Sequence, residues 1–420
     1  MHVSIPVTED LVDDLGGRYV LYSVYLEGFI LFKVRYKELH FWDEQMHRVF
    51  GKRLPAFPPK YYLAMTKSMA EERRTMLEHY LQEIISDPVV SSSEIFIDFL
   101  KKRQLATYKM PTIKLILKVY LADGRHVEVG GQSSDTAERV LETALYKLGV
   151  SRELKEYFRL FITHKDSNGA FTVMKQIAHF EIPFITIWNI NNDSFQIEVR
   201  KWYMDPSTDV MLMGCAAAVD LLYCQAVQEL EMNWFRPTEK QRQNLQHFIK
   251  VDNKIKFLEI MQEVEHYGYM VFGPCTAHLA ETSSIFTVSV GSNELFCSNV
   301  NENFCLPINL MIQWHVNMHV QTEKSNSQLT EFKLEYKQGQ QRTWITICSE
   351  QGFLLSSCLK KILSEQPVTL VKENLEIIEN KSPTNIFNRK PRQVKVPKNK
   401  ISRSFSCEQN NVFESLDFSL

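Results

Sequence analysis

Two arginines, a lysine and a tyrosine near the start of the chain are the side chains whose types and spacing best suit a binding site. Arg35 and Tyr36 end a strand-like run, Lys60 ends a proline-rich loop, and Arg73 lies on a helical pattern. Residues 30–60 contain seven Lys and Arg but three acidic residues, so this segment has a net charge of +4. Such a local excess of cations favours an anionic ligand.

The elements that must position these side chains form a small α+β unit over residues 1–105. Residues 18–36 are rich in β-branched and aromatic residues and predict two strands joined by a turn at Gly28. Helical patterns follow this hairpin, and they cover residues 37–50, 71–85 and 94–101. The proline-rich loop lies between the first two helices.

The segment Leu54–Lys60 resembles the ψ-P-x-x-P-x-K loop of the phox-homology (PX) domain and matches each of its specified positions. The resemblance implies that the ligand is phosphatidylinositol 3-phosphate. Arg35 would then hold the 3-phosphate bidentately, and Tyr36 would lie under the inositol ring. Lys60 would meet the 1-phosphate, and Arg73 would hydrogen-bond the free 4- and 5-hydroxyls.

The same resemblance implies a protein that is cytoplasmic and lies peripherally on early endosome membranes. The formal net charge of −2 disfavours a nucleic-acid partner, so contact with anionic lipid must be local. No run reaches the roughly 18 apolar residues that a spanning helix needs. Three residues directly after the proline loop are predicted to enter the membrane interface: Tyr61, Tyr62 and Leu63.

A second unit covers residues 111–203. A turn at Asp123-Gly124 predicts a hairpin, and a helix with an apolar face follows it. Short strands are predicted over residues 158–163 and 184–187. A hairpin, a helix and further strands in this order are typical of a ubiquitin-like fold.

The rest of the chain contains two further units and a tail. Residues 204–266 have a helical period, with one helix predicted over 211–230. Residues 267–370 are strand-rich and end in a helix, as in a pleckstrin-homology or phosphotyrosine-binding sandwich. Residues 380–420 form a tail that is predicted to be disordered, because its segment 381–404 has eight Lys and Arg and no acidic residue.

This succession of lobes resembles a FERM module, and a PX domain joined to FERM-like lobes is specific to a small group of sorting nexins. The resemblance implies that the last lobe binds Asn-Pro-x-Tyr sequences in receptor or integrin tails and promotes their recycling and transport. The peptide would add a strand to a sheet edge and pack on the closing helix. The predicted contacts are Trp314, His315 and Val316 on the edge and Leu355, Cys358, Leu359 and Ile362 on the helix.

Other partners and functions stay open at this point. The ubiquitin-like lobe also resembles Ras-association domains, with Lys114 and Lys118 on its first strand, so a Ras-family GTPase effector is one alternative. A scaffold between membrane and cytoskeleton is another. The acidic-hydrophobic end of the chain, with its terminal Leu420, resembles the segment by which one family member docks on a retrieval complex.

An enzyme is not expected. The chain contains no G-x-x-x-x-G-K-[ST], G-x-G-x-x-G or G-x-S-x-G motif, so no catalytic residue or cofactor is predicted. The eight cysteines include no C-x-x-C pair, and the pair His315 and His319 lacks the glutamate that a zinc protease needs. The sequence therefore predicts an adaptor without a metal.

Overall fold

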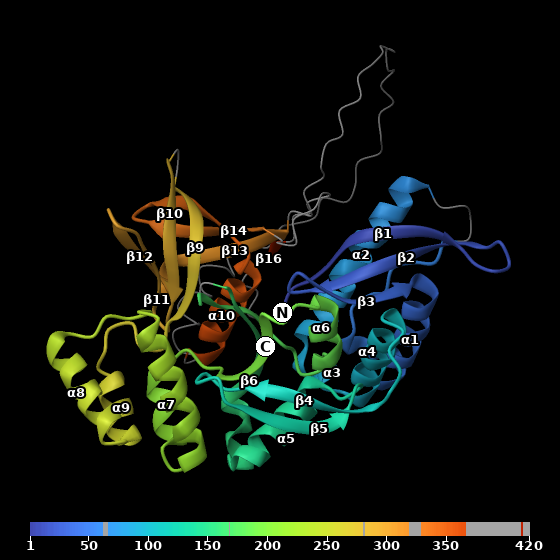
Figure 1. Ribbon diagram of the computed structural model, residues 1–420. Helices are drawn as coiled ribbons and strands as arrows, with labels where there is room; N and C mark the ends of the chain where they lie inside the picture. The colour runs from blue at the N-terminus through green and yellow to red at the C-terminus, as the bar shows by residue number, and fades with distance from the viewer. Residues whose placement is uncertain (62–65, 168, 280–281, 319–328, 367–412, 415–420) are drawn as a thin grey trace.

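The computed structural model describes residues 1–61, 66–167, 169–279, 282–318, 329–366 and 413–414 of the 420-residue chain. Figure 1 shows a PX domain followed by three FERM-like lobes. The described part contains a three-stranded, a five-stranded and an eight-stranded sheet. None of the described helices is long and apolar enough to cross a membrane.

The PX domain pairs a meander of three antiparallel strands with a group of helices. The sequence predicted its second and third strands, but the first strand was not predicted. Its core includes Trp42, which stacks on Phe99 with ring centroids 4.3 Å apart. The elements are β1 (Val3–Val12), β2 (Arg18–Leu26), β3 (Phe29–Arg35), α1 (Tyr36–Phe50), a 3₁₀ turn (Gly51–Arg53), α2 (Lys67–Ser86), α3 (Pro88–Ser91) and α4 (Glu94–Thr107).

The first FERM-like lobe is a mixed five-stranded sheet in the order β5-β4-β8-β6-β7, with β4 parallel to β8. Residues 184–187, predicted as a strand, belong instead to helix α6. Pro183 at its first turn favours a helix start, and Asn191 ends it in the left-handed region. The elements are β4 (Lys114–Tyr120), β5 (His126–Gln132), α5 (Ala137–Leu148), a 3₁₀ helix (Arg152–Tyr157), β6 (Phe158–Lys165), β7 (Phe171–Gln176), α6 (Pro183–Ile190) and β8 (Phe195–Lys201).

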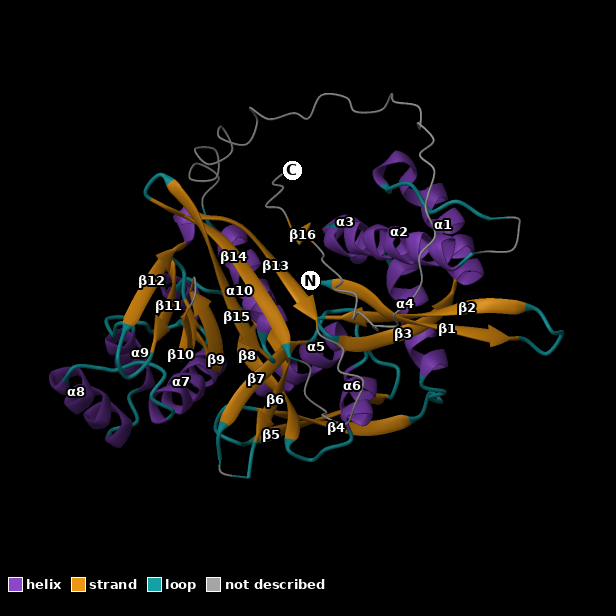
Figure 2. Cartoon of the chain, turned by 90° about the horizontal axis from the view of Figure 1, so that it is seen from above, coloured by secondary structure: helices purple, strands orange, loops and turns teal. Residues whose placement is uncertain are grey.

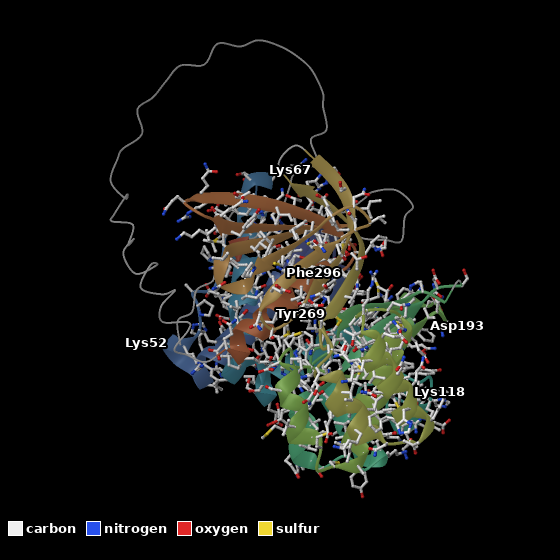
Figure 3. The ribbon with its side chains drawn as sticks, turned by 90° about the vertical axis from the view of Figure 1, so that its left-hand side faces the viewer. Lys52, Lys67, Lys118, Asp193, Tyr269 and Phe296 are labelled. Carbon is white, nitrogen blue, oxygen red and sulfur yellow. The ribbon has the colours of Figure 1, made fainter. Side chains whose placement is uncertain are left out.

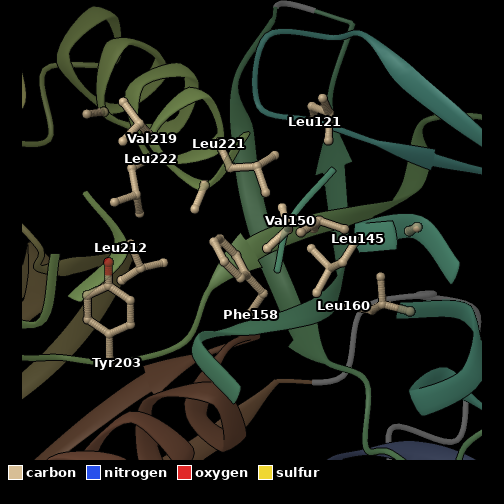
Figure 4. Close-up of a cluster of buried hydrophobic side chains, with 14 of the residues drawn as sticks. Leu121, Leu145, Val150, Phe158, Leu160, Tyr203, Leu212, Val219, Leu221 and Leu222 are labelled. Carbon is tan, nitrogen blue, oxygen red and sulfur yellow. The ribbon is translucent and has the colours of Figure 1, made fainter. Parts of the chain in front are cut away.

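The second lobe is helical. The helix predicted over residues 211–230 is confirmed as α7 (Ala216–Glu231), but it begins later than predicted, because a separate 3₁₀ helix (Pro206–Leu212) ends before Gly214. The other helices are α8 (Glu239–Lys250) and α9 (Lys254–Met261). Figure 4 shows that this lobe shares one core with the first lobe, where Leu212 and Leu222 lie near Phe158.

The third lobe is a strongly bent antiparallel sheet closed by one helix, as predicted. Its strands follow the order β12-β11-β10-β9-β15-β14-β13-β16. The elements are β9 (Met270–Leu279), β10 (Thr282–Val290), β11 (Glu294–Ser298), β12 (Asn303–Pro307), a 3₁₀ turn (Ile308–Leu310), β13 (Met311–Met318), β14 (Thr330–Gln338), β15 (Gln341–Ser349), α10 (Gly352–Glu365) and β16 (Phe413–Glu414).

The PX domain is fixed to the FERM-like lobes by buried polar contacts. Lys175 on β7 pairs with Glu181 at 2.6 Å and donates to the carbonyl oxygen of Leu26 at 3.3 Å. The Ser357 hydroxyl on α10 donates to Glu27 of the PX domain at 3.2 Å. These buried or half-buried contacts join the PX domain to the first and the third FERM-like lobes.

Candidate functional site

Arg35 ends β3 and Tyr36 begins α1, so these two predicted binding residues lie at the corner between sheet and helix. The Arg35 backbone N–H donates to Glu38 Oε2 at 2.9 Å and closes the first turn of α1. The Tyr36 hydroxyl donates to the carbonyl oxygen of Pro58 at 2.8 Å and ties the proline loop to this corner. Burial raises the pKa of Tyr36, so its hydroxyl stays protonated at neutral pH.

Helix α2 carries Arg73 and is fixed in place by bonds to β1. The Arg74 guanidinium donates to the carbonyl oxygen of Ile5 at 3.1 Å, and Glu78 Oε2 accepts the Ile5 N–H at 2.6 Å. Arg74 and Glu78 also pair with each other at 3.0 Å. These bonds set the rotation of α2 about its axis and direct Arg73 toward the proline loop.

The Arg73 guanidinium packs against two tyrosine rings at this corner. Its carbon lies 4.2 Å from the ring centroid of Tyr36 and 4.4 Å from that of Tyr61. One terminal nitrogen lies 3.5 Å from the carbonyl oxygen of Pro59. The residue is 7% exposed, and the aromatic contacts hold the charge without neutralising it.

One buried polar atom at this corner, Arg73 Nε, lacks a hydrogen-bond partner in the described part of the chain, and the Tyr22 hydroxyl lies against the Arg73 side chain. Burial raises the pKa of Tyr22, and the charge of Arg73 and a hydrogen bond from its side chain oppose that rise. Buried polar groups are rarely left without a partner, so each such atom needs an explanation. A polar ligand at the corner would supply one.

Lys60 and Tyr61, at the end of the proline loop, lie at the rim of this corner. Lys60 is exposed at the end of the loop, and Tyr61 is half-buried against Arg73. The predicted membrane contacts Tyr62 and Leu63 fall outside the described residues. The structure therefore brings Arg35, Tyr36 and Arg73 together, with Lys60 at the rim.

Two further residues at this site were missed by the sequence reasoning. The Arg35 guanidinium lies 3.6 Å from the ring centroid of Tyr19 and 3.7 Å from Asp13 Oδ2. Asp13 lies in the turn between β1 and β2, and Tyr19 lies at the start of β2. Their approach depends on the pairing of β1 with β2, and β1 was not predicted.

The second candidate site is the edge of β13. Trp314 is 2% exposed, and its indole N–H donates to Ser356 Oγ on α10 at 2.9 Å. Val316 is likewise in the core, while His315 is half-buried and packs edge-on against Trp344 at 5.5 Å. Trp314 thus joins the sheet to the helix.

The helix residues predicted to contact a peptide are core residues in this structure. Each is at most 1% exposed and packs in the apolar cluster of the third lobe: Leu355, Cys358, Leu359 and Ile362. Direct contact of these side chains with a peptide would require α10 to shift.

The edge of β13 accepts an added strand within this chain. β16 pairs with it antiparallel, with Trp314 opposite Glu414 and His315 opposite Phe413 (Figure 2). The two strands are about a hundred residues apart in the sequence. The predicted partner-binding residue Leu420 lies outside the described residues.

This fold and corner define a class of protein, a PX domain joined to a FERM module, and the comparisons with known proteins agree. Family models match residues 29–103 (PX domain), 115–204 (sorting nexin 17/27/31, FERM domain, F1 lobe) and 268–367 (sorting nexin 17 FERM C-terminal domain). The chain therefore belongs to the sorting nexin family, as both its sequence identity to family members and the order of its domains show.

Three relatives illustrate the similarity. Sorting nexin-31 of Xenopus laevis is 58% identical, with 94% of each chain covered. Sorting nexin-31 of Homo sapiens is 42% identical over 98% of this chain and 92% of the relative. Sorting nexin-17 of Homo sapiens is 33% identical over 87% of this chain and 81% of the relative.

Family membership supports a role in endosomal sorting and peripheral association with endosomal membranes. The PX–FERM members of the family are adaptors without enzymatic activity, and a PX domain implies phosphoinositide binding. Across the described residues, no group of three or more His, Cys, Asp and Glu could hold a metal ion.

Proposed function

We propose that this chain is a sorting adaptor that binds phosphatidylinositol 3-phosphate on early endosomes with the corner around Arg35. Arg35 binds the 3-phosphate, the Tyr36 ring supports the inositol, Lys60 meets the 1-phosphate, and Arg73 bonds the 4- and 5-hydroxyls. The observation that carries this proposal is the state of Arg73: its charged guanidinium is buried against the rings of Tyr36 and Tyr61, and its Nε has no hydrogen-bond partner in the described part of the chain.

Lipid selectivity follows from these roles. Arg73 is buried and would bond the 4- and 5-hydroxyls in the proposed pose, while the 3-phosphate would meet the more open Arg35, whose side chain is 37% exposed. Tyr61, Tyr62 and Leu63 border the corner in sequence and are proposed to contact the bilayer interface.

We further propose that the third FERM-like lobe binds Asn-Pro-x-Tyr-type tails of membrane proteins along β13. The pairing of β16 with this edge supports the proposal, because it demonstrates that the edge accommodates an antiparallel strand. A cargo peptide would take the place of β16, with main-chain hydrogen bonds providing affinity. Trp314 and the four α10 residues would then not contact the peptide directly. They would hold β13 in position through the core of the lobe.

Calorimetric titration of the whole chain with an Asn-Pro-x-Tyr tail peptide is expected to give micromolar binding. The matched control is the same peptide with methylated backbone nitrogens, which cannot pair with a strand and is expected not to bind. Equal binding of both peptides would contradict β-strand addition. Binding of neither would favour the GTPase-effector and cytoskeletal alternatives.

A substitution at Trp314 would test peptide binding less clearly than these changes on the peptide. Because Trp314 is buried and bonded to Ser356, its replacement by alanine would cost about 3–5 kcal/mol of stability. A loss of peptide binding in that variant would therefore not separate lost contact from local unfolding. Changes on the peptide avoid that ambiguity.

A further inference from the structure

The turn between β1 and β2 directs the carboxylate of Asp13 toward the lipid corner, the proposed binding site formed by Arg35, Tyr36 and Arg73. Asp13 Oδ1 accepts the backbone N–H of Gly17 at 2.7 Å and that of Leu15 at 3.2 Å. The Asp13 N–H in turn donates to the carbonyl oxygen of Gly17 at 2.9 Å. These bonds leave Oδ2 directed at Arg35, at 3.7 Å. The carboxylate is thus oriented by the turn itself.

Arg35 is held from two sides by this turn and its flank. The Tyr19 ring lies 3.6 Å from the guanidinium carbon, and the Asp13 carboxylate approaches one terminal nitrogen. Asp13 and Arg35 are each about one-third exposed, so solvent reaches the pair. An incoming phosphate must compete with the carboxylate for the same guanidinium.

We propose that Asp13 is an affinity-setting residue that competes with the lipid phosphate for Arg35. This inference rests on the proposed binding of a phosphomonoester at Arg35. A carboxylate and a phosphate both favour bidentate pairing with a guanidinium, so they exclude each other there. Because the turn holds Asp13 in place, its charge also remains near the bound phosphate and repels it.

The consequence for function is a site whose affinity for the lipid is lowered by Asp13. A partly exposed carboxylate weakens phosphate binding by a modest factor and does not abolish it. The adaptor would then stay on a membrane mainly where a second contact, such as a cargo tail, adds to the lipid contact.

The test is Asp13→Asn in the whole chain. The amide keeps an oxygen for the turn N–H groups and removes the charge. We expect binding to phosphatidylcholine vesicles that contain phosphatidylinositol 3-phosphate to tighten by about two- to five-fold. Asp14→Asn is the matched control, since Asp14 is exposed and forms no ion pair in the described part of the chain. It is expected to change binding by less than about 1.5-fold.

A second variant moves the carboxylate without removing its charge. A Cβ on Gly17 would lie 2.9 Å from Asp13 Oδ2 and 3.0 Å from Oδ1, so Gly17→Ala must displace the carboxylate. Gly17 does not have a positive φ, so alanine fits the backbone. We expect this variant to tighten vesicle binding in the same direction as Asp13→Asn.

The outcomes separate this inference from the lipid proposal. The affinity for soluble inositol 1,3-bisphosphate, measured by competition, should rise by the same factor in Asp13→Asn. This is expected because Asp13 competes with the headgroup phosphate for Arg35. If wild type binds the vesicles but Asp13→Asn tightens no more than Asp14→Asn, or tightens on vesicles but not on the soluble headgroup, the role of Asp13 is overturned. If neither wild type nor Asp13→Asn prefers these vesicles to vesicles with unphosphorylated phosphatidylinositol, the lipid proposal and this inference both fail.

Discussion

Arg35→Gln is expected to weaken binding to vesicles that contain phosphatidylinositol 3-phosphate by about 30- to 150-fold, or about 2–3 kcal/mol. Glutamine cannot supply the two charged N–H groups that a phosphate accepts. The side chain is partly exposed, so the fold should tolerate the change. Vesicle co-sedimentation of both proteins over a range of lipid concentrations measures the effect.

Lys33→Gln is the matched control for this prediction. Lys33 lies two residues earlier on β3, and its ammonium pairs with Glu9 at 2.6 Å at the surface. The variant removes the same charge from the same strand and is expected to weaken binding by no more than about three-fold. Equal losses in the two variants would mean that general electrostatic attraction, and no specific phosphate contact, accounts for binding.

Lys175→Met is expected to lower the free energy of unfolding by about 3–5 kcal/mol. The Lys175 and Glu181 side chains are 1% and 3% exposed, and their charged atoms are 2.6 Å apart. Without the ammonium, the Glu181 carboxylate is buried without its counter-ion, and the carbonyl oxygen of Leu26 loses a donor. Chemical denaturation of the whole chain measures the loss.

Two comparisons make this second prediction specific. Lys118→Met changes an exposed lysine on β4 in the same lobe (Figure 3) and is expected to alter stability by less than about 0.5 kcal/mol. The double variant Lys175→Met, Glu181→Leu removes both charges and should recover at least half of the loss. A single variant as stable as Lys118→Met would contradict the importance of this buried pair for the junction.

The residues of the corner around Arg35 could be proposed from sequence because they belong to local motifs, and their role in lipid binding stays a prediction. Arg35 ends β3, Tyr36 begins α1, and Lys60 closes a proline loop, so the resemblance identified each of them without knowledge of the tertiary fold. Asp13 and Tyr19 could not be found in this way. Their approach to Arg35 depends on the register of β1 against β2, where Val12 lies opposite Arg18.

At the edge of β13, the sequence pattern was not enough to predict which side chains are buried. Alternation in a strand identifies two faces but not which face is buried, so Trp314 was expected to meet a peptide although it faces α10. The helix stripe from Leu355 to Ile362 has the same ambiguity. The pairing of β13 with β16 joins segments so distant in sequence that no local pattern predicts it.

A helix was predicted as a strand in one short apolar segment, residues 184–187. Residues 184–187 are β-branched and aromatic, which favours a strand, but the proline before them starts a helix. For a run of four residues, periodicity alone does not separate the two. The break at Gly214 was missed because the apolar pattern continues across it.

The central claim is that lipid and cargo contacts act together in one adaptor, and vesicle binding tests it most directly. Binding of the whole chain would be measured on vesicles that carry phosphatidylinositol 3-phosphate, an anchored Asn-Pro-x-Tyr tail peptide, or both. Linked sites act at high effective concentration, so we predict that vesicles with both bind at least about ten-fold more tightly than vesicles with either alone. Binding to vesicles with both that is no tighter than binding to vesicles with the lipid alone would contradict the account.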